Sequence, residues 1–86
     1  MTPMSQLDSP ELIRIFAEVL EVNPETLSEQ SAPKNVAGWD SGKAMEIVVT
    51  LEEALNLEFT ADELDEMVSI GATREILKRR GVFIQR

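Results

Sequence analysis

The sequence predicts an all-α fold: a small four-helix bundle with three longer helices, one short helix and a long loop between the first two. Two observations support this prediction. Apolar residues recur every three or four positions in several segments, which is the period of one helix face. Those segments start at residues that can cap a helix, and no alternating runs joined by Asn-Gly or Asp-Gly predict a hairpin.

The first helix is expected over residues 10–22, with Ser9 as its cap and Pro10 at the first helical position, where no N–H is needed. Its apolar stripe consists of Leu12, Ile13, Phe16, Val19 and Leu20. Asn23 and Pro24 should end it. Residues 24–40 then show no sustained period beyond a possible helical turn at 25–27, so they predict a long loop.

We expect Val36 and Trp39 to attach this loop to the core, and Asp40 to cap a second helix over 41–56 that ends at Asn56. The apolar stripe of this helix consists of Ala44, Ile47, Val48, Leu51 and Leu55. These residues are spaced by three, four and seven positions, so they share one face.

Thr60 and Glu63 match a capping box, which predicts a short third helix over 61–67. Ser69 is a candidate cap for the last helix, which should close with the cations at 78–80 before Gly81. Its inward residues are Ile70, Thr73, Ile76 and Leu77. Residues 1–8 and 81–86 are interpreted as terminal tails of a single domain spanning 1–86. The apolar residues at 82–84 could pack back on the bundle or contact a neighbour.

The composition limits the classes of function that this chain can have. With 43% hydrophobic and 28% charged residues, the 86-residue chain fits one folded globular domain. It contains no cysteine and no histidine, which argues against disulfides, thiolate zinc sites and a serine-histidine couple. We therefore expect neither an enzyme, nor catalytic residues, nor a metal site.

The net charge of −8 disfavours nucleic acid and anionic membranes as partners, and favours proteins with basic patches. The N-terminal residues lack the pattern of a signal peptide, and no run approaches the roughly 20 apolar residues of a membrane span. A cytoplasmic location is expected.

Ser41 is open to two interpretations. It is either an ordinary first residue of a helix, or the site of a covalently attached group that places a phosphate at the positive end of the helix. Self-catalysis is disfavoured, because a serine hydroxyl needs a base and the nearest candidates are Asp40 and Lys43, the latter two residues away on another side of the helix. Another enzyme would have to modify this serine.

The stretch GWDS at 38–41, followed by MEIVVTLEE at 45–53, resembles the acyl carrier proteins, the phosphopantetheine-binding carrier family. That family has Asp-Ser-Leu at the start of its second helix, followed by an apolar and acidic run that ends in Leu-Glu-Glu. The segments 57–59 and 69–71 also occur in the family's order, so the resemblance covers about residues 9–80. It implies a discrete, single-domain carrier with the predicted bundle fold.

The resemblance implies that Ser41, with Asp40 as its motif partner, receives 4'-phosphopantetheine from coenzyme A through a phosphopantetheinyl transferase. Acyl groups would then travel as thioesters on this arm to acyl-transferring or acyl-activating enzymes of a fatty acid, polyketide or related pathway. A phosphoprotein and a monomer are expected. A peptidyl or D-alanyl carrier, and an unmodified helical interaction module, remain as alternatives.

Two residues depart from the family pattern. Gly42 stands where leucine is usual, and Lys43 puts a cation in the first helical turn, where the dipole favours anions. Both changes leave the serine intact and bear on which transferase and partner enzymes recognise it.

The second helix also carries a candidate docking surface. Met45 and Val49 lie away from its main stripe, so periodicity allows either the edge of the core or an exposed patch. The resemblance favours a patch that docks to basic surfaces of partner enzymes, consisting of Met45, Glu46, Val49, Glu52 and Glu53. The acids at 62–66 are interpreted mainly as a solvated helix face with cap chemistry. A sheltered acyl chain would lie near Val48, Leu64 and Ile70.

Overall fold

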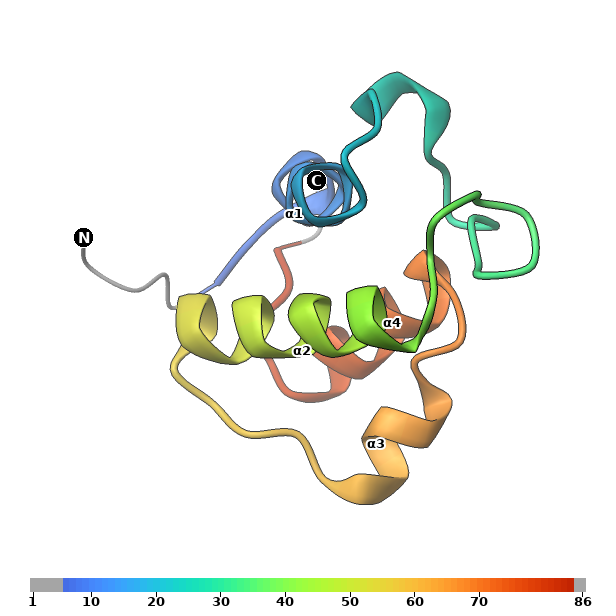
Figure 1. Ribbon diagram of the computed structural model, residues 1–86. Helices are drawn as coiled ribbons and strands as arrows, with labels where there is room; N and C mark the ends of the chain where they lie inside the picture. The colour runs from blue at the N-terminus through green and yellow to red at the C-terminus, as the bar shows by residue number, and fades with distance from the viewer. Residues whose placement is uncertain (1–5, 85–86) are drawn as a thin grey trace.

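The computed structural model describes residues 6–84 and confirms the all-α prediction (Figure 1). Its helices are α1 (Ser9–Leu20), α2 (Ser41–Leu55), α3 (Ala61–Glu66) and α4 (Ile70–Arg79), with a 3-10 turn at Pro24–Thr26. Three helices are longer and α3 is short, as predicted. No helix in this part of the chain is long and apolar enough to cross a membrane.

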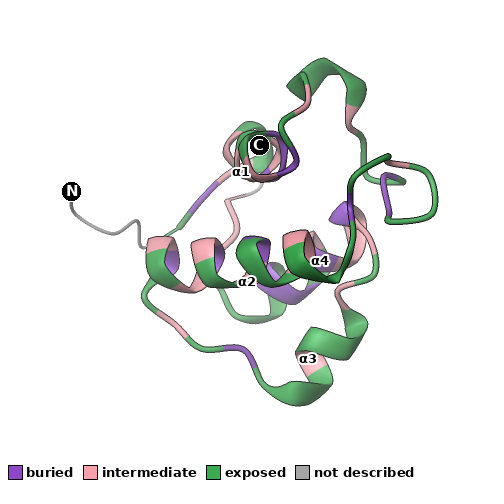
Figure 2. Cartoon of the chain, viewed as in Figure 1, coloured by how far each residue is buried: buried purple, intermediate pink, exposed green. Residues whose placement is uncertain are grey.

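The core forms where α1 packs against α2 and α4. In Figure 1, α1 is seen nearly end-on beside α2, α4 lies behind α2, and α3 forms the edge next to α4. Figure 2 shows that the buried residues of the helices face this shared interior. The core consists of Leu7, Leu12, Phe16, Leu20, Trp39, Ile47, Leu51, Leu55, Phe59, Ile70, Ile76 and Leu77.

The start of α1 corrects one prediction. Asp8, and not Ser9, is the N-cap: its Oδ1 accepts from the Glu11 N–H at 3.0 Å, while Glu11 Oε1 accepts from the Asp8 N–H at 3.0 Å. This reciprocal pair satisfies two free donors at once, which a single serine hydroxyl does not. Ser9 is therefore the first helical residue.

The end of α1 also differs from the prediction of 22. The helix ends at Leu20 because Glu21 adopts a left-handed conformation, with φ of 58°. Asn23 caps the following 3-10 turn instead, where its Oδ1 accepts from the Glu25 N–H at 3.0 Å. The caps predicted at Asp40, Thr60 and Ser69 are confirmed, as are the ends at Asn56 and Gly81.

The long loop is held at two places. Trp39 is 6% exposed and packs on Phe16, with ring centroids 5.4 Å apart. The loop is also attached to the start of α4 by two hydrogen bonds. The Gly71 N–H donates to the Glu29 carbonyl at 2.9 Å, and the Ile70 N–H donates to the Ser31 carbonyl at 3.1 Å. A Cβ at position 71 would lie 3.0 Å from that Glu29 oxygen, so glycine permits this close approach.

The described parts of the two predicted tails are paired. Leu7, fully buried, donates its N–H to the Val82 carbonyl at 2.9 Å and accepts from the Ile84 N–H at 2.8 Å, which forms a parallel bridge to Phe83. The segment at 82–84 thus packs back on the bundle, one of its two predicted alternatives. Residues 1–5 and 85–86 of the predicted tails lie outside the described residues.

An ion pair connects α3 to the end of α4. Arg80 donates to both carboxylate oxygens of Glu63 at 2.8 Å, and its guanidinium lies 5.9 Å from the centre of the Phe59 ring. The hydrogen bonds from Arg80, and then from the Thr60 N–H, lower the pKa of Glu63 from 4.5 to about 2. Arg79 also pairs with Glu66, through one nitrogen and one carboxylate oxygen. The acidic helix face is therefore partly paired, and not simply solvated.

Glu63→Gln should reduce stability by about 1 kcal/mol at neutral pH, because it removes the charge from the pair with Arg80, while glutamine can still complete the capping box. The pKa of Glu63 is lowered in the folded state, so its ionic contribution is present above pH 4.5 and is lost as the pH falls toward 2. Urea unfolding of wild type and variant at pH 7, 3 and 2 measures this. A difference that stays constant across these pH values would contradict the assignment.

Candidate functional site

Ser41 is the first residue of α2 and is exposed. Asp40 precedes it as the N-cap: its Oδ1 accepts from the Lys43 N–H at 2.9 Å, and its carbonyl accepts from the Ala44 N–H at 2.9 Å. Within residues 6–84, no group hydrogen-bonds the Ser41 hydroxyl, and no acceptor engages the N–H groups of Ser41 and Gly42. The hydroxyl is thus accessible for modification, beside two free donors at the positive end of a helix.

Gly42 is not required by the backbone. A Cβ built there would meet only Asp40 Oδ1, at 3.4 Å, which is ordinary contact. The position accepts an L side chain, so the departure from leucine changes the surface beside Ser41 without relieving a steric conflict.

Lys43 has a tertiary explanation that the sequence did not reveal. Its Nζ lies 3.6 Å from Glu21 at the end of α1 and 3.9 Å from Glu46 on the next turn of α2. These two carboxylates offset the unfavourable dipole interaction of a cation in the first turn. Lys43 therefore connects the end of α1 to the start of the helix that carries Ser41.

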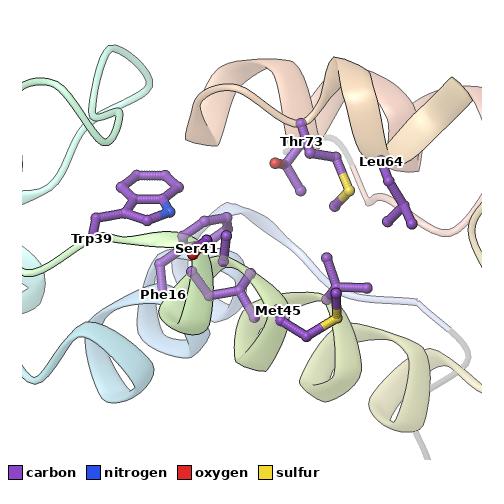
Figure 3. Close-up of a pocket in the computed structure, with 10 residues that line it drawn as sticks. Phe16, Trp39, Ser41, Met45, Leu64 and Thr73 are labelled. Carbon is purple, nitrogen blue, oxygen red and sulfur yellow. The ribbon is translucent and has the colours of Figure 1, made fainter. Parts of the chain in front are cut away.

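A mostly apolar pocket of about 180 Å³ opens beside Ser41 (Figure 3). It is lined by Phe16, Trp39, Ser41, Ala44, Met45, Ile47, Val48, Leu64, Met67 and Thr73. Figure 3 shows Leu64 and Thr73 across the cavity from Ser41 and Met45. Val48 and Leu64 line it as expected for a shelter between the second and third helices. Ile70 does not line this pocket and is fully buried in the core, so this part of the expectation is wrong.

The structure exposes the apolar residues of the candidate docking surface. Met45 is 57% exposed and Val49 is 42% exposed, so both lie outside the core. Glu46 and Glu53 are exposed on the same helix. Sequence reasoning missed Val68, which follows α3 and is 62% exposed. The signal that could have found it is an apolar residue between the end of one helix and the Ser69 cap of the next.

Glu52 differs from its acidic neighbours. It is partly buried, and its Oε2 accepts from the Phe59 N–H at 2.9 Å, which holds the chain after α2 against the core. This carboxylate already has an intramolecular role that the docking interpretation did not include. Within the described residues, no cluster of acidic side chains is arranged to hold a metal ion.

Together, the fold and site define a small helical protein that presents an exposed serine at a helix start, beside an apolar pocket. Residues 10–77 match the family model described as "Phosphopantetheine attachment site". The chain is also 35% identical to the acyl carrier protein of Wolinella succinogenes over 57 residues, which cover 66% of this chain and 75% of that one. The chain therefore belongs to the acyl carrier protein family of phosphopantetheine-binding carriers.

The cofactor of this family is covalently attached 4'-phosphopantetheine. The residues around the start of α2 fit this group. An exposed hydroxyl provides an attachment point, two unpaired N–H groups can receive phosphate oxygens, and the apolar pocket lies alongside.

Proposed function

We propose that Ser41 carries the 4'-phosphopantetheine arm and that the protein transports acyl intermediates between separate biosynthetic enzymes. The observation that supports this most strongly is the position of Ser41, whose exposed hydroxyl has no partner in residues 6–84 and borders an apolar pocket. When bound, the arm supplies the thiol that the chain lacks, and this thiol holds acyl groups as thioesters.

The chain's own residues have positioning roles in this proposal. Asp40 caps α2 and so fixes the orientation of Ser41, while the Ser41 and Gly42 N–H groups stabilise the phosphate charge. Chemistry belongs to the partner enzymes, because the chain has no histidine or cysteine to activate a nucleophile. The protein acts as a monomer in the cytoplasm, in a fatty acid, polyketide or related pathway.

Intact mass spectrometry tests the attachment. The purified chain is incubated with coenzyme A and a broad-specificity phosphopantetheinyl transferase, and the adduct is mapped by peptide fragmentation. One phosphopantetheine on Ser41 is expected. If no transferase adds the group, the carrier function fails and the chain is an unmodified helical interaction module. Aminoacyl or D-alanyl loading of the thiol would identify a peptidyl or D-alanyl carrier.

Docking to partner enzymes is proposed for the exposed face formed by Met45, Val49, Glu46 and Glu53. The two apolar side chains provide adaptable contact, and the acids attract basic surfaces. Glu52 lies on the same helix, but its carboxylate accepts a hydrogen bond from the Phe59 N–H. Its contribution to docking is therefore secondary to this structural role.

Reversing both exposed acids, Glu46→Lys with Glu53→Lys, should lower kcat/KM for loading by the transferase by about tenfold at low salt, since charge steering accelerates encounter. The dependence of the rate on salt should also weaken. Glu18→Lys with Glu25→Lys is the matched control, because it makes the same change of four charge units at two exposed acids, one on α1 and one in the turn that follows it. Equal effects at both places would show a response to net charge and would contradict a local docking surface.

A further inference from the structure

Trp39 contains a buried polar atom that the fold leaves unpaired. Its indole Nε1 is shielded from solvent and has no hydrogen-bond partner among residues 6–84. The indole N–H is a donor only. A buried donor without an acceptor destabilises the folded state, so folded proteins rarely retain one without a reason.

The residue that carries this donor lines the pocket beside Ser41. The packing of Trp39 against Phe16, at an interplanar angle of 57°, holds the ring in place. Figure 3 shows the indole nitrogen on the edge of the ring nearest Ser41 and the other lining side chains. The Thr73 hydroxyl, also in the lining, already donates to the Ser69 carbonyl at 2.9 Å. Once Ser41 is modified, the Trp39 N–H is the unpaired side-chain donor of this lining.

We propose that the pocket selects short acyl groups with a keto or hydroxyl oxygen beyond the thioester carbonyl, and that this oxygen accepts from Trp39 Nε1. The inference rests on the proposed attachment at Ser41. The acyl group is the far end of the arm, so an oxygen along its chain reaches deeper into the pocket than the thioester carbonyl. A saturated chain leaves the donor unpaired, which a site built around a hydrogen bond discriminates against.

The pocket size and its flexible lining agree with this cargo. The pocket is small, at about 180 Å³, which suits a short acyl chain better than a long one. Met45 and Met67 line the cavity, and their unbranched thioether side chains can shift to let an oxygen reach the shielded nitrogen.

The single tryptophan of the chain makes the test direct, since its indole N–H gives one ¹H–¹⁵N resonance. The protein is loaded on Ser41 with phosphopantetheine alone, or with its butyryl, 3-oxobutyryl or 3-hydroxybutyryl form, using the matching coenzyme A derivatives. We expect this resonance to move downfield in the two oxygenated forms relative to the butyryl form. Exchange of the indole proton should also slow by about tenfold, the factor that corresponds to a hydrogen bond of about 1.4 kcal/mol.

The outcomes separate the two proposals. If intact mass shows no adduct on Ser41, the carrier function itself fails. If Ser41 is loaded but the indole resonance and exchange rate are the same in the butyryl and oxygenated forms, only the cargo inference is overturned. A shift already present with the unacylated arm would assign the acceptor to the arm and would likewise overturn it.

Trp39→Phe provides a second measurement, because phenylalanine keeps an apolar ring and removes the donor. In wild type, the 3-oxobutyryl thioester should hydrolyse more slowly on the folded protein than in urea, by a larger factor than the butyryl thioester. The variant should lose this difference between the two cargoes. Retention of the difference in a folded variant would contradict a role for the indole N–H.

Discussion

Ser41→Ala is expected to abolish phosphopantetheine loading while leaving the free energy of unfolding within about 0.5 kcal/mol of wild type. The hydroxyl is exposed and no group in residues 6–84 bonds it, so removing it breaks no interaction there. Alanine also has a high helix propensity. Intact mass after exposure to transferase and coenzyme A, with urea unfolding of the same sample, measures both quantities.

The chain contains a matched control for this substitution. Asp8 caps α1 and Ser9 is its first residue, just as Asp40 caps α2 and Ser41 is its first residue. Ser9→Ala should therefore load as well as wild type, because Ser9 shares the local Asp-Ser arrangement but does not line the pocket beside Ser41. Loading that depends on Ser9, or that persists in Ser41→Ala, would show that the attachment site has been misassigned.

Phe16→Ala is expected to reduce stability by about 3–5 kcal/mol, the usual cost of removing a buried aromatic ring. Phe16 is 1% exposed, packs on Trp39 and also lines the pocket. Proteins of this length have a total stability of about 4–13 kcal/mol, so this single loss removes a large part of it. Urea unfolding followed by far-ultraviolet circular dichroism measures the change without relying on Trp39 fluorescence.

Met45→Ala is the control, because it tests whether the loss of stability comes from burial in the core or only from a position in the pocket lining. Met45 lines the same pocket but is 57% exposed, so its truncation should change stability by no more than about 0.5 kcal/mol. If both substitutions destabilised the protein equally, the core would not be organised around Phe16 as described.

Local signals predicted the helices well because the interactions that start and stop a helix lie within a few residues. The bonds from Lys43 N–H to Asp40, from Glu63 N–H to Thr60 and from Ala72 N–H to Ser69 all span three residues. The one misplaced cap, Ser9 instead of Asp8, arose where two capping residues are adjacent and the choice depended on the partner Glu11. The early end of α1 depended on one left-handed residue, Glu21, which periodicity does not reveal.

The candidate site was predicted in part. The position of Ser41 behind its Asp40 cap follows from the sequence, as does the apolar stripe that places Val48 inward. The exposure of Met45 and Val49 was undecided by periodicity and is settled by the structure. The hydrogen bond from the Phe59 N–H to the Glu52 carboxylate was not predictable, because it forms only after the chain between the two residues turns back on the core.

The sequence by itself determined that this protein is a set of capped amphipathic helices with an unassisted serine at the start of the second, since capping and periodicity are properties of neighbouring residues. Only the tertiary structure decided what surrounds that serine. Lys43 meets Glu21, Trp39 meets Phe16, and residues 29–31 meet the start of α4 across long separations in the chain. Such contacts depend on how the helices pack together, and the pocket with its unpaired indole N–H is a product of that packing.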